Sequence, residues 1–121
     1  VSGKTKLVGV TILTSLDNKS LKEIGFDKDV KKLVQHQARL ATKAKLDAIV
    51  CSPHEIKIVR RVFKKEIITP GIRLLGDDKG DQKRVMSPKQ AFQNGATAII
   101  MGRSLTSNFE KNVKKLIKDL K

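Results

Sequence analysis

Aromatic residues are scarce in this sequence, which has no Trp, no Tyr and four Phe among 121 residues. Proteins that bind single-stranded nucleic acid stack the bases on exposed aromatic side chains, and no glycine-aromatic motif of that kind occurs here. The absence matters because 26 Lys and Arg against 12 Asp and Glu give a formal net charge of +14. The lysines are spread through nearly every segment, as on solvated helix faces, so we do not expect specific nucleic-acid binding.

Cysteine is also scarce, because Cys51 is the only one. An internal disulfide is therefore excluded, which agrees with a reducing compartment. Cys51 and the two distant histidines, His36 and His54, do not form a metal site, so no metal is expected. No apolar run approaches the roughly 20 residues that span a membrane, and no signal peptide is visible. These absences predict a cytoplasmic protein without a membrane partner.

The sequence does contain a regular alternation of apolar runs and helical patterns. Four strand-like runs and the helical patterns between and after them occur at residues 7–13, 20–24, 29–45, 47–51, 53–63, 66–69, 88–94, 96–101 and 109–120. A strand-helix unit repeated four times with short connections predicts an α/β fold with parallel strands and right-handed crossovers.

The nearly continuous β-branched run Leu7–Leu13 predicts a strand that is buried on both faces, as in parallel sheets. We expect one domain over residues 1–121, half the size of a (β/α)₈ barrel of about 250 residues. Doubly wound parallel sheets also fit the pattern.

Two segments have the same N-terminal capping motif for a helix. In Ser52-Pro53-His54-Glu55 the serine is the expected N-cap, the proline takes the first helical position and Glu55 completes a capping box. In Ser87-Pro88-Lys89-Gln90 the glutamine takes the same position as Glu55, and Asn94-Gly95 is the expected end of that helix.

Glycine and arginine follow two consecutive predicted strands, in Thr69-Pro70-Gly71-Ile72-Arg73 and in Ile99-Ile100-Met101-Gly102-Arg103. A glycine lets the backbone approach an anion closely, and arginine offers a planar fork that matches phosphate oxygens. One such pair is usually a turn with a solvated arginine. Two at neighbouring strand ends, with Gln82 in the loop between them, favour a phosphate site.

Nucleophilic catalysis has little support in the sequence. Ser15, Ser52 and Ser104 have no histidine at a suitable position for a catalytic triad. Cys51 ends an apolar run with no neighbour that would lower its pKa, so we expect a buried, unreactive thiol.

A set of motifs along nearly the whole chain resembles the orotidine 5′-monophosphate decarboxylase family, in its C-terminal half from the fifth to the eighth barrel strand. The segments that carry the resemblance are Val10-Thr11-Ile12-Leu13-Thr14-Ser15, Ile49-Val50-Cys51-Ser52-Pro53-His54-Glu55, Thr69-Pro70-Gly71-Ile72-Arg73, Gly80-Asp81-Gln82-Lys83-Arg84-Val85-Met86-Ser87-Pro88 and Ile99-Ile100-Met101-Gly102-Arg103.

The resemblance implies half of a (β/α)₈ barrel from an enzyme that dimerises and converts orotidine monophosphate to uridine monophosphate and CO₂ without a cofactor. It implies that Arg73, Gln82 and Arg103 hold the phosphate with backbone from Gly102. Thr14 and Ser15 would contact the nucleotide nearer its base. Leu74-Leu75 departs from the proline and polar residues usual in the family at that place.

The resemblance also identifies what this half lacks. The family's chemistry depends on an alternating lysine-aspartate array that includes an Asp-x-Lys-x-x-Asp motif in the N-terminal half. Asp27, Asp29, Asp77 and Asp78 do not start that spacing on a strand. Phosphate binding helps catalysis only when the reacting groups are present, so we predict no catalytic residue and no activity for this chain alone.

A half-barrel has two sheet edges with unpaired backbone N–H and C=O groups, and such edges favour pairing with another chain. We therefore expect a partner. Two copies could associate face to face, or the chain could complement a separate N-terminal half-barrel. The alternative function is a degenerate remnant or basic binding module with no catalysis, whose nucleic-acid affinity would fall steeply with salt.

Overall fold

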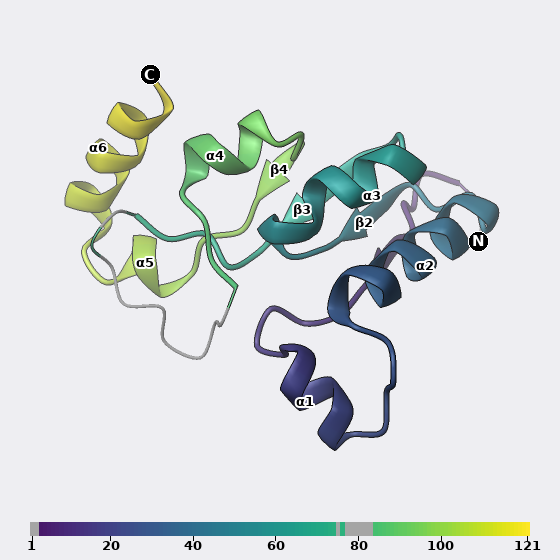
Figure 1. The fold of residues 1–121 in the computed structure, drawn as a ribbon. Coiled ribbons are helices and arrows are strands. Elements are labelled where there is room, and N and C mark those ends of the chain that lie inside the picture. The colour runs from purple at the N-terminus through teal and green to yellow at the C-terminus, as the bar shows by residue number, and fades with distance from the viewer. Residues whose placement is uncertain (1–2, 75, 77–83) are drawn as a thin grey trace.

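The computed structural model describes residues 3–74, 76 and 84–121. The strands are β1 (Val8–Val10), β2 (Ala48–Val50), β3 (Glu66–Thr69) and β4 (Ala98–Ile99). The helices are α1 (Asn18–Glu23), α2 (Val30–Lys43), the 3₁₀ turn η1 (Pro53–Glu55), α3 (Ile56–Val62), α4 (Pro88–Gln93), α5 (Arg103–Thr106) and α6 (Phe109–Leu120). Each strand is followed by at least one helix, so the predicted order of four strand-helix units is confirmed (Figure 1).

The four strands form one parallel sheet in the order β1-β2-β3-β4. Each strand therefore pairs with its neighbour in the sequence, as around a (β/α)₈ barrel. Doubly wound sheets reverse their strand order at a switch point, and no reversal occurs in this sheet. The strand order therefore favours the barrel over the doubly wound alternative.

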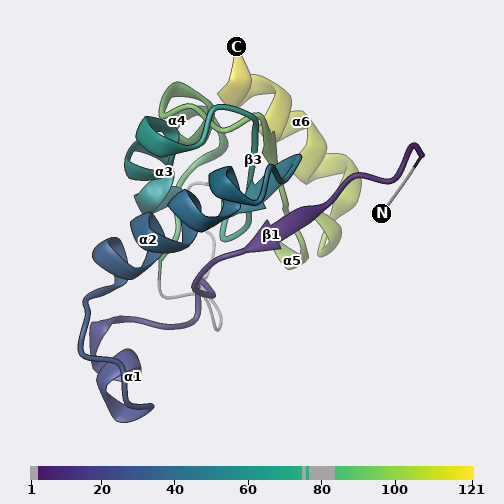
Figure 2. The same cartoon turned by 90° about the vertical axis from the view of Figure 1, so that its right-hand side faces the viewer.

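Helices α2, α3 and α4 lie along one face of the sheet, and β1 forms its outer edge (Figures 1 and 2). The core is the layer between these helices and the sheet, and Phe63 at the end of α3 is one of its largest members, with 2% of its surface exposed. The fully buried side chains of this layer include Val34, Ala38, Ile49, Ile56, Val59, Ile67 and Ala91, and Leu21 of α1 belongs to the same core cluster. Apolar positions at helical spacing on α2 explain its burial, because they form one stripe against the sheet.

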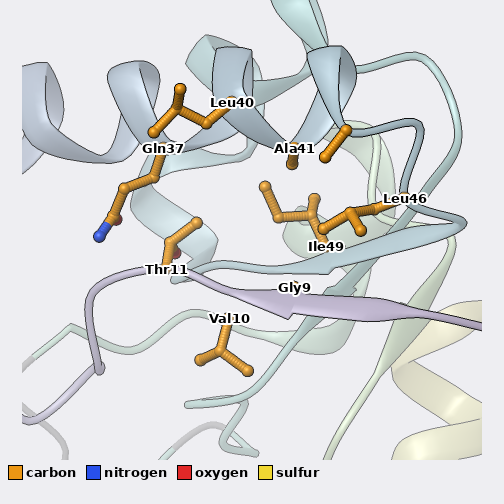
Figure 3. A pocket seen from close by; sticks show the side chains of 9 residues that line it. Gly9, Val10, Thr11, Gln37, Leu40, Ala41, Leu46 and Ile49 are labelled. Carbon is orange, nitrogen blue, oxygen red and sulfur yellow. The ribbon is translucent and has the colours of Figure 1, made fainter.

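The opposite face of the sheet is poorly covered, and this corrects the prediction that Leu7–Leu13 is buried on both faces. Val8 is 46% exposed and Val10 is 62% exposed. The side chain of Val10 points away from α2, whereas Leu46 and Ile49 line the apolar pocket between β1 and α2 (Figure 3). The β-branched run contains a strand, but β1 is shorter than the predicted residues 7–13, and only one of its faces meets another layer within the described residues.

The helix starts differ in part from the expected capping boxes. Ser52 caps η1 by accepting from the His54 N–H at 3.3 Å, but the Glu55 carboxylate makes no hydrogen bond to the Ser52 N–H. Ser87 caps α4 as predicted, and Gly95 follows the helix end with a φ of 110°. The short helix α5 was not predicted.

Candidate functional site

The carboxyl ends of β1 and β2 border an open cavity of about 320 Å³ on the uncovered side of the sheet. Thr14 and Ser15, which were predicted to contact a nucleotide near its base, both line it. Thr14 is 5% exposed, and Ser15 is half-buried. The other lining residues are Val10, Ile12, Leu13, Val50, Cys51, Ser52 and Pro70. The lining is mostly apolar and includes the hydroxyl-bearing side chains of Thr14, Ser15 and Ser52, a combination typical of sites for small organic ligands.

The two arginine-bearing strand ends lie next to each other. The Leu74 N–H, directly after Arg73, donates to Ser104 Oγ at 3.1 Å, and Ser104 directly follows Arg103. This bond is buried, because Ser104 is only 6% exposed and Leu74 only 4%. Residues about 30 positions apart in sequence are therefore held together at the carboxyl ends of β3 and β4.

The backbone at both strand ends is shaped by glycine. Gly71 has a φ of 73°, in the left-handed region that favours glycine. Gly102 precedes α5, and its carbonyl accepts the N–H groups of Leu105 and Thr106 at 2.9 and 3.0 Å. A Cβ at Gly102 would meet no described atom within 4 Å, so no described side chain packs against that side of Gly102.

A short backbone bridge holds the segment that carries Arg73. The Arg73 N–H donates to the Met86 carbonyl at 3.1 Å, and the Met86 N–H donates to the Gly71 carbonyl at 3.2 Å. Arg73 Nη1 also donates to the Ile72 carbonyl at 3.0 Å. Gln82, the third predicted phosphate ligand, lies outside the described residues.

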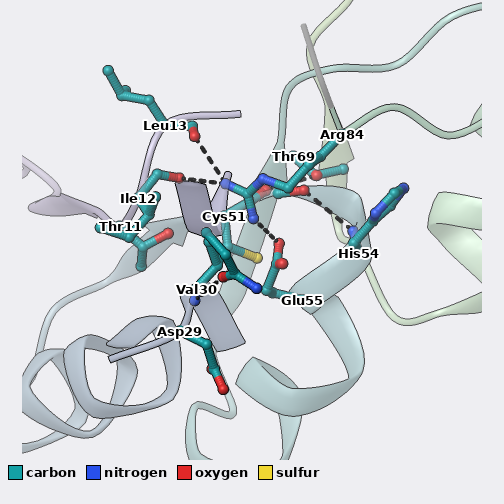
Figure 4. Close-up of polar contacts among 12 residues, drawn as sticks. Thr11, Ile12, Leu13, Asp29, Val30, Cys51, His54, Glu55, Thr69 and Arg84 are labelled. Atoms are coloured by element: carbon teal, nitrogen blue, oxygen red, sulfur yellow. Dashed lines mark hydrogen bonds and ion pairs between the residues drawn. The ribbon is translucent and has the colours of Figure 1, made fainter. Parts of the chain in front are cut away.

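A buried ion pair joins Glu55, which follows β2, to Arg84, which is bonded to the loop after β1. This pair was not predicted from the sequence. Arg84 Nη1 is 2.6 Å from Glu55 Oε2, and the two side chains are 10% and 3% exposed (Figure 4). Arg84 Nη2 donates to the Leu13 carbonyl at 2.8 Å and to the Ile12 carbonyl at 3.3 Å. His54 is exposed, and its Nε2 lies 2.8 Å from the Val85 carbonyl. The sequence singled out Glu55 only as the acid of a capping box, and that pattern predicted a bond to the Ser52 N–H instead of the ion pair with Arg84.

Cys51 is buried, as predicted, and is not poised for nucleophilic attack. Burial raises the pKa of its thiol from 9.0 to about 12, and the Glu55 carboxylate adds to the rise while Arg84 and Arg60 oppose it. The Cys51 carbonyl accepts the Thr69 hydroxyl at 2.7 Å, which ties β2 to β3. The thiol therefore remains protonated at neutral pH and acts as a small packing group.

Residues 3–74, 76 and 84–121 contain no group of three or more His, Cys, Asp or Glu side chains placed to hold a metal ion. Within the same described part of the chain, no helix combines the length and apolar character needed to cross a bilayer.

Comparison with known proteins decides the family. The model of the family described as "Orotidine 5'-phosphate decarboxylase / HUMPS family" matches residues 1–116. The chain belongs to this family.

The orotidine 5′-phosphate decarboxylase from Coxiella burnetii (strain RSA 331 / Henzerling II) is 44% identical over 122 aligned positions, which cover 98% of this chain and 52% of the relative. The orotidine 5′-phosphate decarboxylase from Moorella thermoacetica is 43% identical over 104 positions, covering 84% of this chain and 41% of the relative. The crystal structure of the orotidine 5′-phosphate decarboxylase from Lactobacillus acidophilus superposes with a TM-score of 0.71 at 28% identity, over 95% of this chain and 49% of that one.

The chain thus spans about half the length of the decarboxylases that it matches. Together with the parallel order of the four strands, this confirms the half-barrel prediction and agrees with a resemblance to the C-terminal half.

Proposed function

We propose that this chain is the nucleotide- and phosphate-binding half of an orotidine 5′-phosphate decarboxylase. Arg73, Gln82 and Arg103 hold the 5′-phosphate, with backbone from Gly102. Thr14 and Ser15 contact the nucleotide nearer its base. The observation that carries the proposal is the 3.1 Å bond from the Leu74 N–H to Ser104 Oγ, which supports a shared site for the two arginines that precede these residues.

The proposed site suits a phosphate for electrostatic and geometric reasons. Arginine side chains bind phosphate oxygens through paired N–H groups, and the open backbone at Gly102 permits close approach. The cavity beside Thr14 and Ser15 offers an apolar space for a flat ring. A nucleoside monophosphate has both chemical parts, which is why we prefer it to free phosphate.

Chemistry requires a second half-barrel in this proposal. The sequence contains no Asp-x-Lys-x-x-Asp motif, so binding alone cannot stabilise the decarboxylation transition state. Among the described residues β1 pairs only with β2 and β4 only with β3, which leaves one edge of each available. We propose that the complementary half-barrel, within the same polypeptide or as a separate chain, covers these edges. A second copy of this chain is the competing partner.

The experiment is a titration of the chain with uridine monophosphate, followed by amide NMR shifts. We expect saturable shifts at Thr14, Ser15 and Arg103, and at least tenfold weaker binding in Arg103→Ala, because a charged hydrogen bond to phosphate is worth about 1.5–3 kcal/mol. Arg39→Ala is the matched control, because Arg39 is an exposed arginine on α2.

A basic binding module without a nucleotide site gives a different result. Arg103→Ala and Arg39→Ala would then behave alike, and the affinity would fall steeply with salt for any polyanion. That result would contradict the proposed function.

A further inference from the structure

We propose that Arg84 and Glu55 form a buried clasp that positions the two ends of the nucleotide site relative to each other. The inference rests on the proposed function and deepens it, because it names residues that position the proposed nucleotide-binding residues without holding the nucleotide themselves. Arg84 and Glu55 are positioning residues, and their bonds fix the distance between the Thr14–Ser15 end of the site and the Arg73 end.

The guanidinium of Arg84 holds the loop after β1. Arg84 Nη2 donates to the carbonyls of Ile12 and Leu13, the two residues immediately before Thr14 and Ser15. The Leu13 carbonyl also accepts the Leu16 N–H at 3.0 Å, so one oxygen receives both the turn bond and the guanidinium. β1 is an edge strand that ends at Val10, and these bonds hold the chain beyond it in place.

The segment in which Arg84 itself lies is bonded to the loop after β3. Val85 and Met86 follow Arg84 directly, and the Met86 backbone exchanges hydrogen bonds with Gly71 and Arg73. Any displacement of Arg84 is therefore transmitted to the backbone of Arg73. Through Arg84 and the Met86 backbone, the loop after β1 is linked to the loop after β3. Figure 4 shows the first part of this link, from Arg84 to the Ile12 and Leu13 carbonyls.

Glu55 supplies the reason why the guanidinium stays in this position. A buried arginine without a countercharge is strongly unfavourable, and the Glu55 carboxylate at 2.6 Å provides one from the start of α3. Within the described residues Arg84 Nη1 and Glu55 Oε2 have no hydrogen-bond partner, so the contact is an ion pair without aligned hydrogen-bond geometry. A buried ion pair is weak evidence for a gain in folding stability, because desolvating the two charges offsets their attraction. We therefore assign to this pair the role of specifying one arrangement of the two loops.

The clasp makes a prediction that a general stabilising role does not make. A ligand with both a base and a phosphate needs the two ends at a fixed separation, whereas inorganic phosphate contacts only one end. Loss of the clasp should therefore weaken binding of uridine monophosphate by about tenfold, which corresponds to about 1.4 kcal/mol, and leave phosphate binding within twofold.

The test uses the double variant Arg84→Met/Glu55→Met, because Arg84→Met alone leaves a buried carboxylate unpaired and can fail to fold. Replacing both partners of a buried pair by apolar groups of similar volume is often neutral for stability. Arg84→Lys is the conservative variant, which keeps the charge but cannot reach two carbonyls and a carboxylate with one planar fork. Arg39→Met is the control for replacing an arginine by methionine at an exposed site.

Two readouts keep this inference separate from the proposed function. The Leu16 N–H is bonded within the loop after β1, and the Arg73 and Met86 N–H groups are bonded between the loop after β3 and the segment of Arg84. Amide hydrogen exchange at all three should accelerate together in the double variant and not in Arg39→Met. Unchanged exchange at both loops would overturn the clasp, whether or not the chain binds any nucleotide.

Titrations with uridine monophosphate and with inorganic phosphate complete the test. If the unaltered chain binds neither probe, the proposed function fails while the exchange result still decides the clasp. If the unaltered chain binds uridine monophosphate and the double variant binds it equally well, the clasp is wrong and the proposed function stands.

Discussion

Val10 offers a single-residue test of the proposal that a second half-barrel covers the exposed face of the sheet. Its side chain lies on the face of the sheet away from α2 and is 62% exposed. In the proposed complete barrel the second half covers this face. Burying a whole Val side chain stabilises by at least about 1.5 kcal/mol, so covering the exposed part of Val10 contributes about 1 kcal/mol.

The substitution Val10→Asp should abolish association with a partner half while the chain itself stays folded. Association loses the contribution of about 1 kcal/mol and must also bury an unpaired carboxylate, which costs at least about 3 kcal/mol. The sum of about 4 kcal/mol corresponds to a dissociation constant raised about 1,000-fold. In the isolated chain the new side chain remains in water, so the unfolding free energy should change by no more than about 1 kcal/mol.

Isothermal titration calorimetry with an N-terminal half-barrel from the Coxiella burnetii relative measures this effect. Ile24→Asp is the matched control, because Ile24 is 60% exposed at the end of α1, which lies apart from the sheet (Figure 1). We expect Ile24→Asp to bind like the unaltered chain. Equal affinity of Val10→Asp and the unaltered chain, with both folded by circular dichroism, would refute the idea that this face is covered by the partner.

Two further predictions concern the chain alone. Because the pKa of Cys51 is raised from 9.0 to about 12, the folded state keeps a proton that the unfolded state loses, so its contribution to stability is complete below pH 9 and falls between pH 9 and 12. Urea unfolding should therefore show a loss of about 1 kcal/mol in the unfolding free energy from pH 9 to pH 10 that is absent in Cys51→Ala, and the same pH dependence in both proteins would contradict the assignment. Phe63→Ala should lower the unfolding free energy by about 3–5 kcal/mol, because Phe63 is in the core and only 2% exposed. Phe109→Ala, at a 61% exposed position, should lower it by less than about 0.5 kcal/mol. Similar losses in the two variants would contradict the placement of Phe63 in the core.

Much of the fold could be predicted from the sequence because local patterns determine it. The run Glu66–Thr69 ends at Pro70-Gly71, and β3 has these same bounds. The apolar stripe of the second helical pattern likewise predicts α2, whose N-cap Asp29 accepts from the Lys32 N–H. Proline, glycine and capping side chains act within a few residues, so their effects can be read without knowing the tertiary structure.

The errors have a different physical origin, because they depend on residues distant in sequence. The burial of Val8 and Val10 is set by what covers the sheet, which the β-branched run itself cannot specify. Glu55 matches a capping-box pattern, but its carboxylate pairs with Arg84, a residue far along the chain. The joining of the two arginine-bearing strand ends through Ser104 was also invisible, although both ends were singled out as a phosphate site.

The most direct test of the central claim is a decarboxylation assay on mixed halves. The chain, the Coxiella burnetii N-terminal half-barrel and their equimolar mixture are each incubated with orotidine monophosphate, and uridine monophosphate formation is measured. The account predicts turnover only in the mixture, and a lower kcat/KM when the chain carries Arg103→Ala. Turnover by the chain alone, or an inactive mixture in which the two halves demonstrably associate, would contradict it.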